Sequence, residues 1–116
     1  MADLTRDDIL AADDIRLEKV HVKEWGGDVY IKQLSGKEQD KFEQESRGKN
    51  GGPNLINMRA RMVAAALVDK DGKKLFSDED IIKLSNKSGS VLNRLIDKIG
   101  ELNRITEEDL EKIAKN

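Results

Sequence analysis

The residue types that carry chemistry in enzymes are scarce in this chain. Its 116 residues include no cysteine, which excludes thiolate nucleophiles, disulfides and thiolate metal sites. The one histidine, His21, lies in an alternating stretch beside Lys19 and Lys23, and no serine nucleophile is close in the sequence. We interpret His21 as a solvent-facing strand residue. The inventory therefore predicts no catalytic residues, no metal ligands and no cofactor, and we expect that the protein is not an enzyme.

Two other segments resemble ligand sites but fail on spacing. A calcium loop that began at Asp69 would need glycine at its sixth position and glutamate at its twelfth, where this chain has Lys74 and Asp80. The segment is better interpreted as a solvated tight turn at Asp71 and Gly72 between short extended pieces that span residues 67–76. Residues 48–52 are rich in glycine, but they lack the GxxxxGK[ST] pattern of a phosphate-binding loop.

Charge and hydropathy restrict which partners the protein can bind and in which compartment it acts. The chain has 21 basic and 23 acidic residues, a net charge of -2, so it carries no electrostatic footprint for nucleic acid. No apolar run reaches the roughly 18 residues that a membrane span requires, and the acidic N-terminus does not resemble a secretory signal. We expect a cytoplasmic protein that binds neither nucleic acid nor membrane.

The most apolar stretch predicts a central helix over about 54–68, because its alanine and methionine content favours helix and its apolar residues recur at spacings of three and four. Only Arg59 and Arg61 interrupt it. We expect both arginines at the margin of the helix, with their charged groups in water or on a carboxylate.

An antiparallel hairpin is predicted over 16–34, where two alternating runs with β-branched residues flank Gly26 and Gly27. A lone hairpin is marginal in water, so it must pack on helices or gain strands. We predict an α+β fold in which this N-terminal hairpin packs on a bundle of about four to five helices, in a single domain over 16–116. Residues 1–15 form an acidic flexible arm or a short helix. Further helices are predicted at about 35–47, 78–85, 88–102 and 106–114.

Five apolar residues are candidates for binding a partner. Trp25 occupies a turn and Phe42 lies on a highly charged helix. Trp25 either folds back on the hairpin as a structural lid or is an exposed anchor for another protein, and Phe42 either contacts the core or is such an anchor; we favour the first interpretation for each. A groove beside a helix stripe could accept a helical partner, or a partner strand could extend the hairpin. The stripe consists of Val91, Leu95 and Ile99.

Several motifs, taken in order, resemble those of a known family. They include DDILAADD near the N-terminus, EWGG at 24–27, the helix start LSGKE at 34–38 followed by Phe42, the run from Arg59 to Asp80 and the ending that contains LNRITEE at 102–108. Together they resemble the tail assembly chaperones of long-tailed, siphovirus-like bacteriophages, over nearly the whole chain. The motifs carry packing and turn signals and no catalytic signature.

The resemblance implies a non-enzymatic role in virion morphogenesis. Such chaperones bind the tape-measure protein, keep it soluble, help recruit the major tail (tube) protein and leave before the tail is complete. The resemblance therefore implies action in the host bacterial cytoplasm and absence from the mature virion. In many such phages a frameshift also produces a longer form, which is a further expected partner.

Two other classes of function and one further association remain open. A structural virion component, such as a head-tail connector or a minor tail protein, would persist in finished particles. A small regulator would need a recognition helix with a basic face, and the helices here have mixed charge. Exposed strand edges also offer a route to a homo-oligomer.

Overall fold

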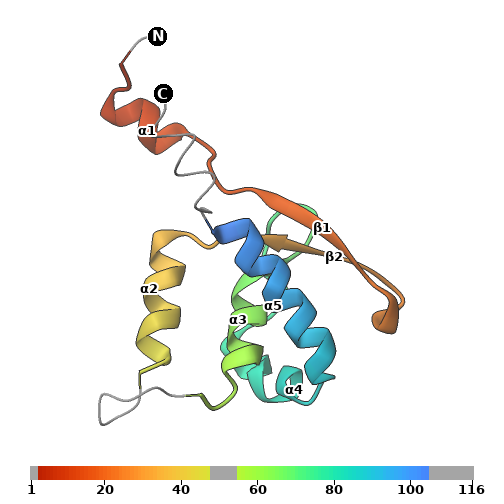
Figure 1. Cartoon of the computed structure of the whole chain (residues 1–116). Helices are drawn as coiled ribbons and strands as arrows, with labels where there is room; N and C mark the ends of the chain where they lie inside the picture. Colours follow the sequence, from red (N-terminus) through yellow and green to blue (C-terminus); the bar gives the residue numbers. More distant parts are fainter. Residues whose placement is uncertain (1–2, 48–54, 105–116) are drawn as a thin grey trace.

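The structure, a computed structural model, describes residues 3–47 and 55–104 and combines helices with a small antiparallel sheet (Figure 1). Its fold is α+β with an N-terminal hairpin, which confirms the predicted class. In chain order the elements are α1 (Arg6–Ala11), β1 (Leu17–Val22), the short 3₁₀ helix η1 (Lys23–Trp25), β2 (Gly27–Lys32), α2 (Gly36–Glu45), α3 (Met58–Ala66), β3 (Leu67–Val68), the 3₁₀ helix η2 (Asp78–Asp80), α4 (Ile81–Ser85) and α5 (Gly89–Asn103).

The predicted hairpin turns through η1 rather than through a tight two-glycine loop. Of its two glycines, only Gly26 takes a positive φ, at 74°, and Gly27 already begins β2. In the antiparallel register Val20 pairs with Val29, and Val22 pairs with Gly27. The positive φ of Gly26 follows the three-residue 3₁₀ turn and directs the chain back along β1.

A third strand, β3, completes the sheet in the order β1-β2-β3. Leu67 pairs with Ile31 and Val68 pairs with Tyr30, both antiparallel. The sequence prediction of a helix through residue 68 was therefore wrong at its end. Leu67 takes an extended conformation, with φ -76° and ψ 128°, and the chain passes from α3 into β3 without a loop.

The beginning of the central helix also differs from its prediction over 54–68. Helix α3 starts at Met58, after Asn57 in a left-handed conformation with φ 55°. The predicted helices at 35–47, 78–85 and 88–102 correspond to α2, to η2 with α4, and to α5. The predicted helix at 106–114 lies outside the described residues. Of the two forms expected for residues 1–15, the structure has the short helix α1.

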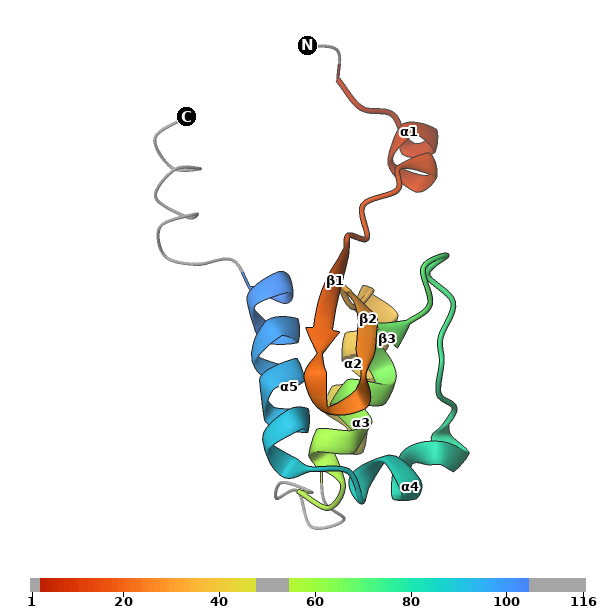
Figure 2. The ribbon, with the colours of Figure 1, turned by 90° about the vertical axis from the view of Figure 1, so that its right-hand side faces the viewer.

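The core lies between the sheet and helices α3, α4 and α5, with α3 at its centre (Figure 2). Each fully buried valine, leucine or isoleucine side chain contributes about 1.5–3 kcal/mol through removal of apolar surface from water. The buried apolar residues are Val22, Ile31, Leu34, Ala60, Val63, Ala64, Ala66, Leu67, Val68, Leu84, Val91, Leu92, Leu95 and Ile99.

The two arginines of α3 have different environments, and Arg61 is not at the exposed margin where both were expected. Arg59 is exposed, and its Nε donates to Asn93 Oδ1 on α5 at 2.8 Å. Arg61 is only 9% exposed and donates to the main-chain carbonyl of Glu45 at the end of α2. Arg61 thus ties α3 to α2 inside the structure instead of lying in water.

Candidate binding surface

An apolar groove of about 380 Å³ lies between α2 and α5, with α3 contributing to its lining. We call it the α2–α5 groove. Phe42 and Ile96 are half-buried, so part of each side chain remains accessible to a partner. A concave apolar surface with a few polar groups at its edge is the usual form of a site for a helix or a small ligand. The apolar lining consists of Leu34, Phe42, Met62, Ile96 and Ile99.

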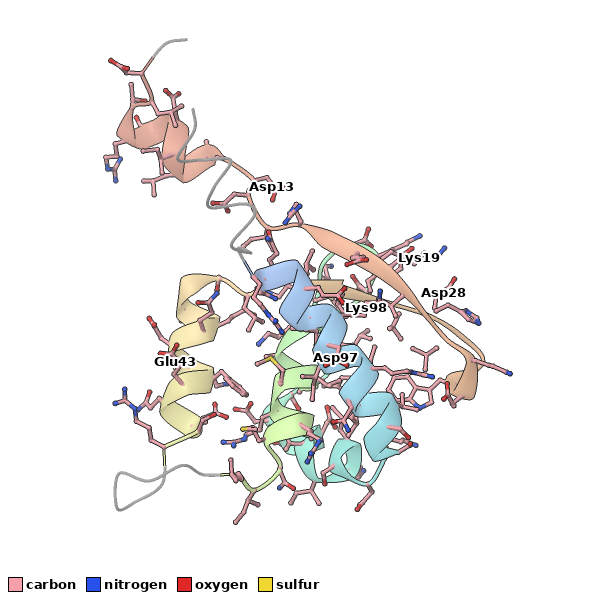
Figure 3. The ribbon with its side chains drawn as sticks, in the orientation of Figure 1. Asp13, Lys19, Asp28, Glu43, Asp97 and Lys98 are labelled. Atoms are coloured by element: carbon pink, nitrogen blue, oxygen red, sulfur yellow. The ribbon has the colours of Figure 1, made fainter. Side chains whose placement is uncertain are left out.

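Polar side chains from the two helices border the groove. Figure 3 labels Glu43 on α2 and Asp97 on α5, and both side chains are exposed. Arg104 also lines the groove, so its border contains two carboxylates and one guanidinium. An apolar helix that carries basic residues beside its apolar stripe would match the two carboxylates.

Hydrogen bonds fix the groove where α5 ends. The Gln33 Nε2 donates to the Leu102 carbonyl at 3.0 Å, and the Leu34 main-chain N–H donates to Asn103 Oδ1 at 2.8 Å. The Asn103 amide in turn donates to the Ile99 carbonyl at 2.8 Å. These bonds join the segment that precedes α2 to the last turn of α5, so both walls of the groove are held at this end.

The five residues predicted to bind a partner do not form one surface. Phe42 and Ile99 line the α2–α5 groove, although Ile99 is only 2% exposed. Val91 and Leu95 are buried in the core, with exposed fractions of 2% and 1%, and Leu95 also lines a separate cleft between β1 and α5. The hypothesis of one open groove beside the whole α5 stripe is therefore corrected: the sheet and α3 already cover most of it.

Trp25 borders a second concavity, of about 450 Å³, which we call the Trp25–Phe76 hollow. The indole is half-buried and packs against the core, as does Phe76, so Trp25 is folded onto the structure and still lines a surface. The remaining lining comes from η2, from α4 and from the residue two positions after α4. The lining consists of Trp25, Phe76, Asp80, Lys83, Leu84 and Lys87.

Glu38 joins three parts of the chain through its carboxylate. Its Oε1 accepts from Lys32 on β2 and from the Ser35 main-chain N–H, and its Oε2 lies 3.5 Å from Lys74 Nζ. Desolvation raises the pKa of Glu38, but the hydrogen bonds from Lys32 and Ser35 outweigh it and leave the pKa below its ordinary value. With its side chain 14% exposed, Glu38 is a structural ion-pair residue that positions α2 beside the sheet.

The outer face of the hairpin carries a smaller charged cluster. His21 Nδ1 donates to Asp28 Oδ1 at 2.7 Å, and Lys19 Nζ lies 3.4 Å from Asp28 Oδ2. The hydrogen bond from His21 lowers the pKa of Asp28. The His21 side chain is 68% exposed, as the alternating pattern predicts. Among residues 3–47 and 55–104 no group of three or more His, Asp or Glu could hold a metal ion.

Sequence reasoning missed Met62 and Ile96 as part of a binding surface. Both belonged to apolar stripes in the sequence, but periodicity gives no sign of which side of a stripe stays accessible. The position of α2 beside α5 determines which side of each stripe stays accessible, and this position depends on contacts between residues far apart in the chain.

A search of the helices within residues 3–47 and 55–104 finds none with the length and hydropathy of a membrane span.

Comparisons with known proteins agree with this architecture. The family model described as "Phage tail assembly chaperone" matches residues 5–113. Among solved structures, the tail assembly chaperone of bacteriophage HK97 superposes with a TM-score of 0.63 at 22% sequence identity, over 87% of this chain and 95% of that one. At this identity the structural likeness shows the fold alone. No curated protein sequence matches the chain. Because the family model spans nearly the whole chain, the protein belongs to the phage tail assembly chaperone family.

Proposed function

We propose that this protein is a non-enzymatic tail assembly chaperone that binds the tape-measure protein and helps recruit the major tail tube protein. The observation that carries the proposal is the family match over residues 5–113. The α2–α5 groove supports it, because the groove offers an apolar surface to a long client that would otherwise aggregate. The chain would act in the host bacterial cytoplasm and be absent from the finished virion.

The groove gives the client-binding step a specific form. A helical segment of the client would place apolar side chains against Phe42, Met62 and Ile96, which differ from Val91 and Leu95 in being partly accessible. Basic residues of the client would lie near Glu43 and Asp97. Self-association and contact with a longer frameshifted form belong to the same proposal, because one client offers many binding positions along its length.

Co-expression with the tape-measure protein of the same genome tests the proposal. The expected result is that the client becomes soluble and co-purifies with many copies of this chain. Phe42→Ser should reduce the amount of soluble client while the circular dichroism spectrum stays unchanged, because a half-buried groove residue contributes more to binding than to the core. Ile82→Ser is the matched control, since Ile82 is 70% exposed on α4 and does not line the groove.

Two results would contradict the proposal. A client that stays insoluble at every expression ratio would contradict the proposed chaperone activity. Detection of this chain by mass spectrometry in purified, mature virions would instead favour the structural alternative, a head-tail connector or a minor tail protein. An equal loss for Phe42→Ser and Ile82→Ser would leave the activity in place but exclude the α2–α5 groove as the client site.

A further inference from the structure

Three charged side chains at the border of the α2–α5 groove are unpaired within the described residues. Glu43 lies on α2, Asp97 lies on α5, and Arg104 is the C-cap residue of α5. All three are exposed, and none forms an ion pair or a side-chain hydrogen bond with another residue in 3–47 or 55–104. Their charges are therefore available to an occupant of the groove.

Helix geometry places the two carboxylates at one level of the groove. The Leu34 N–H, just before α2, donates to Asn103 in the last turn of α5 at 2.8 Å, and from this hydrogen-bonded end the two helices run in opposite directions (Figure 1). At a rise of about 1.5 Å per residue, Glu43 lies about 10 Å from the start of α2, and Asp97 lies about 9 Å from the end of α5. The two carboxylates therefore border the groove at nearly the same level, one from each wall.

Arg104 supplies the opposite charge nearer the hydrogen-bonded end. Its main-chain N–H donates to the Gly100 carbonyl at 2.9 Å, and its guanidinium folds back over Gly100, which also lines the groove. A Cβ at position 100 would lie 3.0 Å from Arg104 Nη2, so the guanidinium uses space that glycine leaves open. Gly100 follows Asp97 by three residues, a rise of about 4.5 Å, so the positive charge lies about one helical turn from the level of the carboxylates.

The charges surround an apolar floor, and together they restrict what can bind. Phe42, Met62 and Ile96 are half-buried and form the accessible part of the floor. On an α-helix, residues three or four positions apart lie about one turn apart on the same face. A helix would therefore match every group if basic residues flanked its apolar stripe and an acidic residue followed one turn closer to the hydrogen-bonded end. A uniformly basic helix would instead place a like charge on Arg104.

We propose that the α2–α5 groove selects helical segments of its client by this order of charges, and that Arg104 is the residue that determines the specificity. Basic residues of the segment lie beside Glu43 and Asp97, and an acidic residue one turn away pairs with Arg104. The inference rests on the proposed function and adds to it the chemical class of the client segment. Exposed ion pairs of this kind contribute little affinity, but a wrong charge is penalised, so they discriminate among segments that are equally apolar.

Overlapping synthetic peptides that cover the tape-measure protein of the same genome test the inference. Fluorescence anisotropy measures the binding of each labelled peptide to the full chain. The peptides that bind should carry an apolar helical stripe with basic flanks and an acidic residue three or four positions from them. Replacing that acidic residue by lysine should weaken binding about three- to tenfold, because attraction by Arg104 becomes repulsion. High salt should reduce this factor and leave the binding to the apolar floor.

A charge reversal in the chain should invert the preference. Arg104→Glu should bind the lysine-substituted peptide more tightly than the original peptide, because the reversed charge on the protein then meets its complement. Lys98→Glu is the matched control: it makes the same change of charge at an exposed position of α5 that does not line the groove, and it should keep the wild-type preference. Circular dichroism of both variants checks that the fold is retained.

Several outcomes would overturn the inference. They are a tape-measure protein from which no peptide binds, bound peptides that lack the predicted spacing of charges, and an Arg104→Glu chain that keeps the wild-type preference. An equal change for Arg104→Glu and Lys98→Glu would show an effect of net charge and not of the groove. If the wild-type chain still keeps the whole tape-measure protein soluble, each of these results ends the inference alone and leaves the proposed function in place.

Discussion

Helices α1 and α5 begin in the same way and end up in opposite environments. Thr5 caps α1 and Ser88 caps α5, each by accepting a main-chain N–H three residues later. Yet Leu95 of α5 is 1% exposed, whereas Leu10 of α1 is 68% exposed. Figure 2 shows α5 against the sheet and α1 away from it. Local sequence is therefore sufficient to start a helix, while burial depends on what the rest of the chain brings to it.

This difference separates two uses of apolar residues in the molecule. The stripe of α5 is occupied by α3 and the sheet and belongs to the stability of the fold. The apolar residues of α1 contribute nothing to the core and are available to a partner. Substitutions in the two helices should therefore act on different measured quantities.

Truncation of the α5 stripe should produce the largest loss of stability. Leu95→Ala leaves a cavity in the core, and we expect the free energy of unfolding to fall by about 2–5 kcal/mol. Urea denaturation followed by Trp25 fluorescence would measure the change. Ile82→Ala, on the exposed face of α4, is the control and should change the free energy by less than about 0.5 kcal/mol. Equal losses would mean that Leu95 is not a core residue.

Removal of the Glu38 charge should have an intermediate effect. Glu38→Gln leaves Lys32 beside a neutral amide in a region where both side chains are about 15% exposed. We expect the free energy of unfolding to fall by about 1–3 kcal/mol. Glu101→Gln tests the same change in an exposed pair with Lys98 and should cost less than about 0.5 kcal/mol.

The same variant should alter the dependence of stability on pH. The pKa of Glu38 is lowered in the folded state from 4.5, so its contribution is present above pH 4.5 and is lost as the pH falls through the folded pKa. Wild-type stability should therefore decrease more steeply below pH 4.5 than that of Glu38→Gln. Parallel curves for the two proteins between pH 5 and 2.5 would contradict the assignment of Lys32 and Ser35 as the groups that lower this pKa.

Removal of the helix caps should give the smallest effects and the most direct comparison. Ser88→Ala should lower the global free energy of unfolding by about 1 kcal/mol, because α5 is part of the cooperative core. Thr5→Ala removes an equivalent cap from α1 but should leave that free energy unchanged. Its effect should appear only as faster amide exchange in residues 6–11. A shared loss of global stability would show that α1 is coupled to the core.

Much of the fold could be predicted from the sequence, since most of its elements have local signals. The hairpin followed from alternation around Gly26 and Gly27, and α5 followed from apolar residues at helical spacing. Strand β3 had a local signal only for a short extended piece before the turn at Gly72, and its place in the sheet could not be predicted in this way. Leu67 and Val68 continue an apolar run that is compatible with helix, and only their pairing with Ile31 and Tyr30, more than 30 residues earlier, makes them a strand.

The binding surface was harder to predict for the same physical reason. Periodicity located the stripe of Val91, Leu95 and Ile99 but could not indicate how little of it α3 and the sheet leave accessible. Burial of Arg61 was missed because it accompanies a hydrogen bond to the Glu45 main-chain carbonyl, a group that every residue possesses. Trp25 and Phe42 were identified as unusual residues, and the structure places them at two separate concavities.

The central position of β2 has a consequence for the order of folding. Its pairing with β1 joins residues that are close in sequence, so this hairpin can close within microseconds once the chain begins to fold. The pairing of β2 with β3 requires closure of the whole segment between Lys32 and Leu67. This closure costs chain entropy before any β2–β3 contact can form and offset it. We expect completion of the sheet to occur together with docking of α3, as the rate-limiting event of folding.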